Sequence, residues 1–596
     1  MPQTALRVRQ VTSSTHADVA PRRVSLAVIA LARSAVPTLA ANDPVGITVI
    51  NFAVHATRYG QILFPPKVLH KESAKMGSAN MPQPLGFKPA TVKLDTTIAE
   101  LYKLASPSNA DTRLGMVFCG VSSGLDLTSQ FPRNTKFLYQ DSPFNTEPRH
   151  QLTSENQELQ KSLAMKYLSL IPQRDAFISG KVPVILFNAN QTPDQVEHGK
   201  REAETTFSVL DKSQQPELIF CDGPTDIPIE KYQIDKLAYK LIPDTLEKYP
   251  LIHDPEKHWY LNSKAALARS GLPTPRAEII DIEGYSPLAA ECCHLCVTDP
   301  GELPFIPIDC TGKRGNWLKD QMDRIIEAVE RRPVPFVFKN QQTFGGAGTW
   351  VITTDAEKQN LLQELRSEHG SPLRKLLPQI TQSNYHLQPG SVIISELVHN
   401  PVADHGLTFI VTDQGGAIFL GASEQMTDNN NAWIGSTINY SSQDEILQPK
   451  FSSLINRTAK WVASHGYFGP VGIDVLETES PGQTETQTGE VTTYHIVDVN
   501  VRPSGSLALP LLRNHFSSRG WHWASSVSIT TTNESRKEFM ERWKEEFMSG
   551  QMIVLSWYED LETQKSIADV VVGGEDEDAL QKKMRLVRET TGEVVF

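Results

Sequence analysis

Cysteine is scarce in this chain, which has six cysteines among 596 residues. Small secreted domains that depend on disulfide bonds concentrate many cysteines in a short sequence. Six thiols spread over this length do not form such a framework, so a disulfide-stapled fold is excluded. A reducing compartment is favoured, and we expect a cytoplasmic protein.

The densest cysteine group, at residues 292–296, offers only half of a zinc site. Cys293 and Cys296 have the spacing of one ligand pair, and thiolates suit zinc. No second Cys/His pair follows at standard spacing, because Cys310 stands alone downstream. Loop or buried thiols are therefore favoured, and a structural zinc ion remains the alternative.

The chain also lacks an excess of basic residues. Its 57 Lys and Arg are outnumbered by 69 Asp and Glu, which gives a formal net charge of -12. This balance argues against a nucleic-acid partner and against binding to an anionic membrane surface. A nucleotide can still be bound by a few local cations and a metal ion, so small-molecule chemistry is left open.

No apolar run is long enough for a transmembrane helix; the nearest, Val24–Ala41, is interrupted by Arg33. The first forty residues contain five arginines and a single acid, Asp18. Such a composition also occurs in organelle-targeting leaders. We favour an N-terminal strand and helix of the first domain, with a targeting segment as the alternative.

What the chain does contain is an alternation of short apolar runs and helical stretches in its first 250 residues. The pattern predicts a helix at Glu155–Tyr167 and strands at Gly46–Val54, Leu114–Val121, Val182–Phe187 and Glu217–Cys221. Such alternation is typical of an open, Rossmann-like α/β layer with parallel strands. Ligands bind beyond the carboxyl ends of such strands, so the loops after Cys119 and Cys221 are candidate substrate contacts, with ordinary turns as the alternative.

One of these loops also matches a hydrolase motif. Residues 120–124 read Gly-Val-Ser-Ser-Gly after a predicted strand, which is the pattern of a nucleophile elbow. No helix clearly follows at Leu125–Pro132, and no partner His and acid can be identified. A hydrolase is therefore a minor alternative.

The most informative stretch is 497–506, which alternates apolar and polar residues with the period of a β-strand. The valines fall on one face, and the other face carries Asp498, Asn500 and Arg502. Mg²⁺ takes oxygen ligands and shares them with nucleotide phosphates, and a guanidinium can stabilise a developing anion. The row predicts a metal and phosphate site, followed by a loop of Ser504, Gly505 and Ser506.

Four further elements precede this strand in a fixed order. They are Lys264 at a helix start, the strand Phe336–Lys339 with the glycine loop after it, Glu396 in the strand Ser391–Leu397, and Asp474. Glycines let backbone N–H groups approach phosphate oxygens, and Lys339 adds charge. Each element alone has an ordinary explanation: a solvated lysine, a turn, an exposed strand residue and a turn cap. The glycine loop lacks the Walker and dinucleotide patterns, so it does not predict a nucleotide site by itself. The prediction rests on the order and spacing of all these elements together.

In this order the elements resemble the ATP-grasp superfamily over about residues 255–515. Within it, the chain most resembles fungal ligases of specialised metabolism. The resemblance implies an ATP-grasp fold of α/β and α+β domains. The implied boundaries are an N-terminal α/β substrate-side domain at 1–250, a central domain at 251–333, a lid at 334–400, a metal and catalytic domain at 401–515, and an α/β tail at 516–596.

The resemblance also implies a role for each residue of the motifs. Lys264 and Lys339 resemble the lysines that contact the ATP phosphates, and Arg502 the arginine that stabilises the acyl phosphate. The lid loop over the phosphates would be formed by Gly345, Gly346 and Gly348. The adenine and ribose contacts would come from Glu396, Leu397, Val398 and Asp404. The magnesium ligands would be Asp474, Asp498 and Asn500, and the loop of Ser504, Gly505 and Ser506 would face the carboxylate substrate.

Three features depart from the family pattern. The metal strands are separated by the polar stretch Thr478–Thr492, which we expect to be an exposed loop or insertion that still leaves Asp474 and Asp498 side by side. The first metal position is Asp where Glu is common. The lid loop has fewer glycines than the richest members of the family.

The resemblance implies an ATP-dependent carboxylate–amine ligase that forms an amide through an acyl phosphate and releases ADP and phosphate. Mg²⁺ is the expected ion, with Mn²⁺ as the alternative, and the partners are a small carboxylate and a small amine such as an amino acid. A homodimer is left open. The alternatives are an ATP-grasp small-molecule kinase and a nucleotide-binding regulatory protein without turnover.

Overall fold

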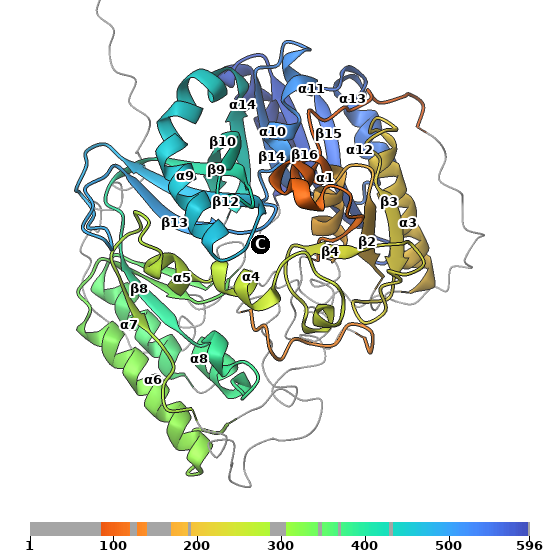
Figure 1. The fold of residues 1–596 in the computed structure, drawn as a ribbon. Helices are drawn as coiled ribbons and strands as arrows, with labels where there is room; N and C mark the ends of the chain where they lie inside the picture. Colours follow the sequence, from red (N-terminus) through yellow and green to blue (C-terminus); the bar gives the residue numbers. More distant parts are fainter. Residues whose placement is uncertain are drawn as a thin grey trace, which may run out of the picture. The chain divides into compact units, whose positions relative to one another are not determined.

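The computed structural model describes residues 85–119, 128–139, 168–188, 192–285, 306–343, 348–367, 371–427 and 433–593. Within these residues, the strands form three sheets with helices packed on them (Figure 1). Mixed α/β and α+β architecture is therefore confirmed. The strand predicted at Gly46–Val54 and the helix predicted at Glu155–Tyr167 lie outside the described residues.

The first sheet is parallel, with the strand order β3-β2-β1-β4. Its strands are β1 (Leu114–Val117), β2 (Pro183–Phe187), β3 (Glu217–Cys221) and β4 (Lys236–Tyr239). β1 and β2 are buried along their whole length, which explains their unbroken apolar sequences. The open parallel layer is confirmed. β4 was not predicted, because four residues that begin with a lysine give no clear alternation.

Helices cover one face of this parallel sheet. They are α1 (Ile98–Ala105), a helix over 168–177, and α3 (Pro193–Ser208). Thr97 begins α1 with a capping box, in which its side chain accepts from Glu100 N and the Glu100 carboxylate accepts from Thr97 N. The apolar residues of these helices join a core that also contains Ala524 and Val571 of the largest sheet. That shared core fixes the parallel layer against the largest sheet.

The second sheet is small and antiparallel, with the order β5-β8-β6-β7. Its strands are β5 (Ala277–Ile280), β6 (Phe336–Asn340), β7 (Thr349–Ile352) and β8 (Val392–Glu396). It packs with α6 (Lys313–Arg331), α7 (Asp355–Arg366) and α8 (Pro372–Leu376) around one apolar core. The predicted strands agree closely.

The third sheet has nine strands, of which eight follow the order β13-β12-β9-β10-β11-β14-β16-β15 and β17 pairs with β14. The strands are β9 (Pro401–Val411), β10 (Ala417–Thr427), β11 (Trp433–Asn439), β12 (Gly469–Thr478), β13 (Tyr494–Asn500), β14 (Trp523–Thr532), β15 (Met552–Asp560), β16 (Lys565–Gly574) and β17 (Gly592–Glu593). Strands from both sides of residue 515 thus belong to one sheet, and the tail boundary proposed there is not a sheet boundary.

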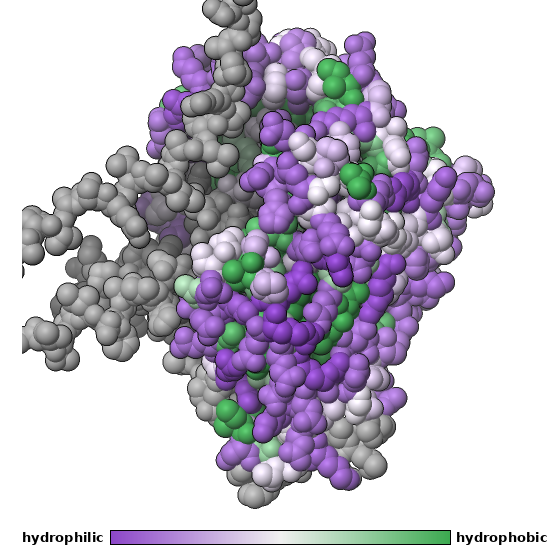
Figure 2. Space-filling model, turned by 90° about the vertical axis from the view of Figure 1, so that its left-hand side faces the viewer, coloured by the Kyte–Doolittle hydropathy of each residue, from purple (hydrophilic) through white to green (hydrophobic). Residues whose placement is uncertain are grey.

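Helices of this part of the chain pack on the nine-stranded sheet. They are α4 (Pro255–Leu261), α5 (Lys264–Arg269), α9 (Gln448–Ser464), α10 (Ala508–Leu511), α11 (Arg513–Ser517), α12 (Arg536–Arg542), α13 (Lys544–Ser549) and α14 (Glu577–Thr590). The apolar residues of α9 pack on β9 and β12, and those of α12 to α14 pack on β14 to β16. Among the described helices, none combines the length and the apolar character that crossing a membrane requires. On the face shown in Figure 2 the described residues are mainly hydrophilic, with hydrophobic ones scattered among them.

The polar stretch Thr478–Thr492 connects β12 to β13 as expected, but it is not simply exposed. Thr484 and Thr486 are buried, and Glu485 accepts a hydrogen bond from Arg276 at 2.8 Å. Thr484 Oγ1 accepts from the backbone N–H of His399 at 3.0 Å. The connection is therefore attached to segments beside the small sheet, because its short polar side chains satisfy backbone groups there.

A buried histidine makes the fold sensitive to acid. Burial lowers the pKa of His515 to about 4, against a hydrogen bond that its Nε2 donates to Gly550 O at 2.9 Å. The neutral ring is favoured in the fold, whereas the unfolded chain takes up a proton below its usual pKa of about 6.5. Stability is therefore lost as the pH falls from about 6.5 toward 4, by about 2 kcal/mol at pH 5 from this residue.

This loss can be measured with a variant that does not titrate. His515→Gln keeps a donor for Gly550 O, so its free energy of unfolding should fall less between pH 7 and pH 5 than that of the wild type. The expected difference is about 2 kcal/mol, measured by urea unfolding at both pH values. Equal losses in the two proteins would show that His515 does not contribute to acid sensitivity.

Candidate functional site

The two acids of the sequence motifs lie opposite each other on neighbouring antiparallel strands. Asp474 of β12 pairs in register with Asp498 of β13, and Gly472 pairs with Asn500. Directly opposed residues point to the same side of a sheet, so Asp474, Asp498 and Asn500 share a face. The strand pairing is as predicted, although 23 residues separate the two acids in sequence.

Lys264 reaches this pair from the first turn of α5. Ser263 begins the helix, and its side chain accepts from Ala266 N, as the sequence predicts for a capping residue. The Lys264 side chain is 10% exposed, and its ammonium donates to Asp498 Oδ1. A solvated surface lysine is therefore wrong for this position, because the side chain carries its charge to a partly buried carboxylate.

Lys339, at the end of β6, approaches the same strand. Its ammonium donates to Val497 O at 3.0 Å. Burial and the neighbouring charge of Lys264 together lower the pKa of Lys339 to about 8, against the opposing charges of Asp498 and Asp474. Both lysines line a small cavity of about 20 Å³, together with Ser395 of β8 and Ala277 of β5. The small sheet, α5 and β13 thus bring two lysines together in one place.

The acids of the site differ in how easily they ionise. Burial raises the pKa of Asp474, and the charges of Asp498 and Asp404 raise it further. Burial acts in the same direction on Asp498, but Lys264, Lys339 and Arg502 outweigh it and hold that pKa below its usual value. Three carboxylates and three cations thus influence one another at this place.

Asp404 completes this acidic group from β9. Burial raises the pKa of Asp404, and its Oδ1 is buried without a hydrogen-bond partner among the described residues. The resemblance assigned it to the ribose, whereas its charge here acts on Asp474. An all-oxygen donor set with one unpartnered carboxylate oxygen fits a hard divalent cation such as Mg²⁺. The ammonium of Lys264 provides positive charge at that place in this structure.

Gln425 of β10 supports Asp474 and was not found from the sequence. Its Nε2 donates to Asp474 Oδ1 at 3.1 Å, and its Oε1 accepts from Trp433 Nε1 at 2.7 Å. Gly406 on the strand between them makes this reach possible, because a Cβ there would lie 2.1 Å from Gln425 Nε2. A contact that crosses a strand has no signature in the local sequence.

Asn262 holds Arg502 and was likewise missed. Its Oδ1 accepts from Arg502 Nη1 at 2.5 Å and from the N–H of Val501 at 2.9 Å, and its own Nδ2 donates to His258 O at 2.8 Å. Asn262 stands directly before Ser263, the capping residue of α5. Arg502 is buried, so Asn262 fixes a guanidinium at the end of β13 beside the acids.

The loop after Arg502 is packed closely against the sheet. Ser504 and Ser506 bring their hydroxyls to 3.3 Å from each other. A Cβ on Gly472 would lie 2.9 Å from Ser504 Cβ, and a Cβ on Gly505 would lie 2.7 Å from the Trp433 ring. Two glycines therefore let this loop lie directly over β12 and Trp433.

The remaining predicted residues lie near the small sheet. Glu396 ends β8, where its N–H donates to Arg276 O at 2.8 Å, and Leu397 and Val398 follow it. Gly348 closes the turn into β7 with a φ of 66°, which favours glycine. Gly345 and Gly346 lie outside the described residues. So do the cysteine group at 292–296 and the Gly120–Gly124 motif.

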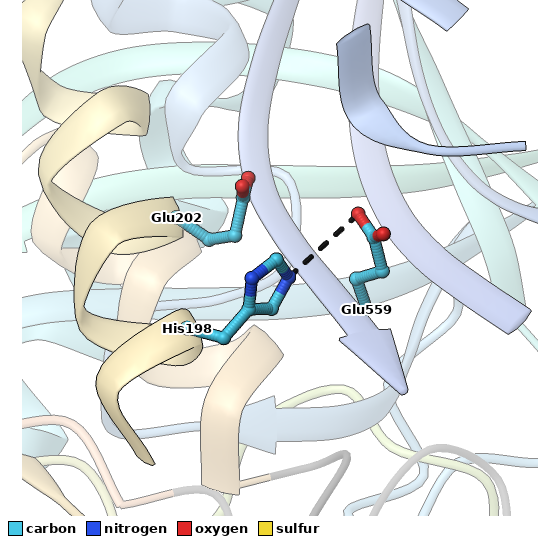
Figure 3. A group of neighbouring side chains, drawn as sticks. All are labelled: His198, Glu202 and Glu559. Carbon is cyan, nitrogen blue, oxygen red and sulfur yellow. Dashed lines mark ion pairs between the residues drawn. The ribbon is translucent and has the colours of Figure 1, made fainter. Parts of the chain in front are cut away.

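A second group of metal-ligand side chains joins the parallel layer to the largest sheet. His198 and Glu202 of α3 and Glu559 of β15 bring ligand atoms within 4.8 Å of one another (Figure 3). His198 Nε2 lies 3.8 Å from Glu559 Oε2, and Arg536 Nη1 lies 3.2 Å from Glu202 Oε2. Because a guanidinium already neutralises one carboxylate, we assign this group as an ion-pair junction.

The comparisons with known proteins give weak similarities. No protein-family model matches the chain, and no curated protein matches it in sequence. The solved structures include N5-carboxyaminoimidazole synthetase from Staphylococcus aureus complexed with ADP, at 10% identity and a TM-score of 0.40 over 79% of this chain and 96% of that one. They also include biotin carboxylase from Campylobacter jejuni, at 12% identity and a TM-score of 0.37 over 69% and 86%.

A third such structure is phosphoribosylamine–glycine ligase from Thermotoga maritima, at 13% identity and a TM-score of 0.37 over 71% of this chain and 95% of that one. TM-scores below 0.5 at these identities carry no conclusion about activity. The function of this chain therefore has to be argued from its own residues.

Proposed function

We propose that this protein is an ATP-dependent carboxylate–amine ligase of the ATP-grasp type. The observation that carries the proposal is the cross-strand pair of Asp474 and Asp498. Lys264 donates to Asp498, and Lys339 donates to the backbone carbonyl of the preceding residue, Val497. Two acids for a metal ion and two cations for phosphates are the parts that phosphoryl transfer requires. The sequence resemblance independently suggests the same roles.

In the proposed reaction, an oxygen of the substrate carboxylate attacks the γ-phosphorus of ATP, and ADP leaves. The amine nitrogen then attacks the acyl carbon, and phosphate leaves as the amide forms. Asp474, Asp498 and Asn500 would hold the metal ion, which when bound would neutralise phosphate charge. Lys264 would exchange its contact with Asp498 for the phosphates, and Lys339 would hold them from the other side.

Arg502 would stabilise the charge that develops on the acyl phosphate and on the tetrahedral state that follows. Asn262 fixes its guanidinium before substrate arrives, so little reorganisation is needed when charge develops. The backbone of Gly505 and the hydroxyl of Ser506 lie next in the chain and would face the carboxylate. Strands β6 to β8 of the small antiparallel sheet belong to the segment that the resemblance identifies as the lid. Closure of this lid would exclude water, which would otherwise hydrolyse the acyl phosphate.

The test is ADP release from Mg·ATP with a panel of amino acids and small carboxylic acids, repeated with hydroxylamine as the nucleophile. A ligase should release ADP and form a hydroxamate, with no AMP. ADP release with a phosphorylated product and no hydroxamate would assign the small-molecule kinase instead. Nucleotide binding without turnover across the panel would assign the regulatory protein, and AMP release would rule out the acyl-phosphate route.

A further inference from the structure

A buried arginine approaches the candidate site from the parallel layer. Arg174 lies in the helix over 168–177, and its guanidinium is 6.0 Å from the centre of the Trp433 ring. The residue is 93% buried, since 7% of its surface is exposed. Its Nε is buried without a hydrogen-bond partner among the described residues. A guanidinium with a buried and unused donor is costly unless it has a further partner.

The two acids nearest to Arg174 are engaged by other donors. Asp175 lies 3.6 Å from Arg174 Nε, and its Oδ2 accepts from Lys240 Nζ at 2.6 Å. Asp569 lies 3.9 Å from Arg174 Nη1, and its oxygens accept from the hydroxyls of Ser528 and Ser556. Both distances are longer than that of a charge-assisted hydrogen bond, so neither acid accepts a hydrogen bond from the guanidinium of Arg174.

Trp433 connects Arg174 to the catalytic residues. One part of its ring lies against the Gly505 position, and its Nε1 donates to Gln425, which in turn donates to Asp474. Arg174 and the loop that would face the activated carboxylate therefore both lie beside the same indole ring. A small molecule lying along Trp433 could reach both places at once.

The local charge also favours an anion. Lys240 is fully buried, and both Arg174 and Arg502 act on its charge, so three cations influence one another here. Asp175 and Asp569 lie beside Arg174, and the charge of Arg502 also acts on Asp498. The guanidinium of Arg174 thus places positive charge beside the Trp433 ring, and burial makes that charge act strongly on a ligand.

We propose that Arg174 binds a second anionic group, a carboxylate or a phosphate ester, on one of the two substrates. The inference rests on the proposed function and narrows its substrate class to small acids that carry two anionic groups. The guanidinium fork matches either anion with two parallel hydrogen bonds, which a lysine at this position would not provide. The Trp433 ring lies beside the guanidinium of Arg174 and would direct the rest of the ligand toward Gly505.

A purely structural ion pair would look different. An arginine that serves only to join two layers normally donates to protein acceptors at hydrogen-bond distance, as Arg536 Nη1 does to Glu202 and Thr206, although Arg536 Nε, like Arg174 Nε, has no partner among the described residues. Arg536 and Arg174 are similarly buried. Among the described residues Arg174 makes no hydrogen bond of this kind, and its contacts with Asp175 and Asp569 are longer ion pairs. That difference between two buried arginines is what points to a ligand.

The first experiment measures binding and needs no turnover. The unfolding temperature of the full chain is followed with Mg²⁺ and a non-hydrolysable ATP analogue, in titrations with succinate and with butyrate at constant ionic strength. These probes have the same chain length and differ by one carboxylate. Succinate should raise the unfolding temperature with an apparent affinity at least tenfold higher than that of butyrate. Equal effects of the two probes, or no effect of succinate, would overturn the inference.

The second experiment uses variants. Arg174→Met should abolish the difference between succinate and butyrate, and Arg174→Lys should restore part of it. Arg113→Met is the control, because Arg113 is exposed and pairs with Glu217 at the start of β1. A succinate preference that survives in Arg174→Met would overturn the inference. If that variant does not fold, the wild-type comparison still decides.

The third experiment separates this inference from the proposed function. ADP release is compared for aspartate and asparagine, glutamate and glutamine, and phosphoserine and serine, and the same compounds are also titrated for binding. For any pair that supports ADP release, the inference predicts that the KM of the anionic member is at least tenfold lower than that of the neutral member. Turnover with a preference for the neutral members would overturn the inference and keep the ligase. Selective binding of the anionic members without any ADP release would support the inference and count against the ligase.

Discussion

Replacing Asp498 by asparagine is expected to lower substrate-dependent ADP release by about 1000-fold. The change keeps the size of the side chain and removes the charge that Lys264 contacts and that the proposed metal ion would contact. Lys264 would be left near a neutral amide, and the acid pair would lose the carboxylate that ionises more readily of the two. The measurement is the rate of ADP release at saturating ATP over a range of Mg²⁺ concentrations.

The control for this variant is Asp413→Asn. Asp413 follows β9 and accepts a hydrogen bond from Ser106 Oγ at 2.9 Å, away from the acid pair. It should keep ADP release within about twofold of the wild type, because it removes only a local polar contact. Full activity of Asp498→Asn, or wild-type activity in excess chelator, would contradict the metal assignment.

Arg502→Met is expected to lower kcat by about 100- to 1000-fold and to leave the KM for ATP nearly unchanged. Asn262 holds the guanidinium beside the acids, where it would meet charge that develops only during reaction. An interaction made only in the transition state lowers kcat without weakening nucleotide binding. Steady-state kinetics of ADP release and hydroxamate formation measure both quantities.

Arg502→Lys distinguishes charge from geometry at this position. A lysine keeps the positive charge but cannot reproduce the planar fork, so it should recover only part of kcat. Arg113→Met again serves as the control for loss of an arginine and should leave kcat unchanged. A higher KM for ATP with an unchanged kcat would show that Arg502 binds the nucleotide in its ground state.

The strands β12 and β13, which carry Asp474 and Asp498, could be predicted from sequence because their pattern is local. Alternation around Asp474 and around Asp498 identifies two strands, and the apolar positions decide which face each acid occupies. An antiparallel pairing then places the two acids side by side, as the register of β12 and β13 shows. The start of α5 was predictable for the same reason, since Ser263 is a local capping residue.

The supporting residues could not be predicted in this way. Gln425 reaches Asp474 across β9 only because Gly406 leaves room for its amide. Asn262 holds Arg502 from 240 residues away. Neither contact leaves a repeat or a spacing in the sequence, because each depends on how separate strands and helices pack.

The sequence by itself determined the order of the elements, the acids and lysines of the site, and the strands that carry them. Local periodicity and capping act over a few residues, so they can be read without a fold. The tertiary structure decided that Lys264 is buried against Asp498, that the connection at 478–492 is attached beside the small sheet, and that Arg174 stands over Trp433. Burial, charge balance and unsatisfied donors depend on neighbours that are distant in sequence, and only folding brings those neighbours together.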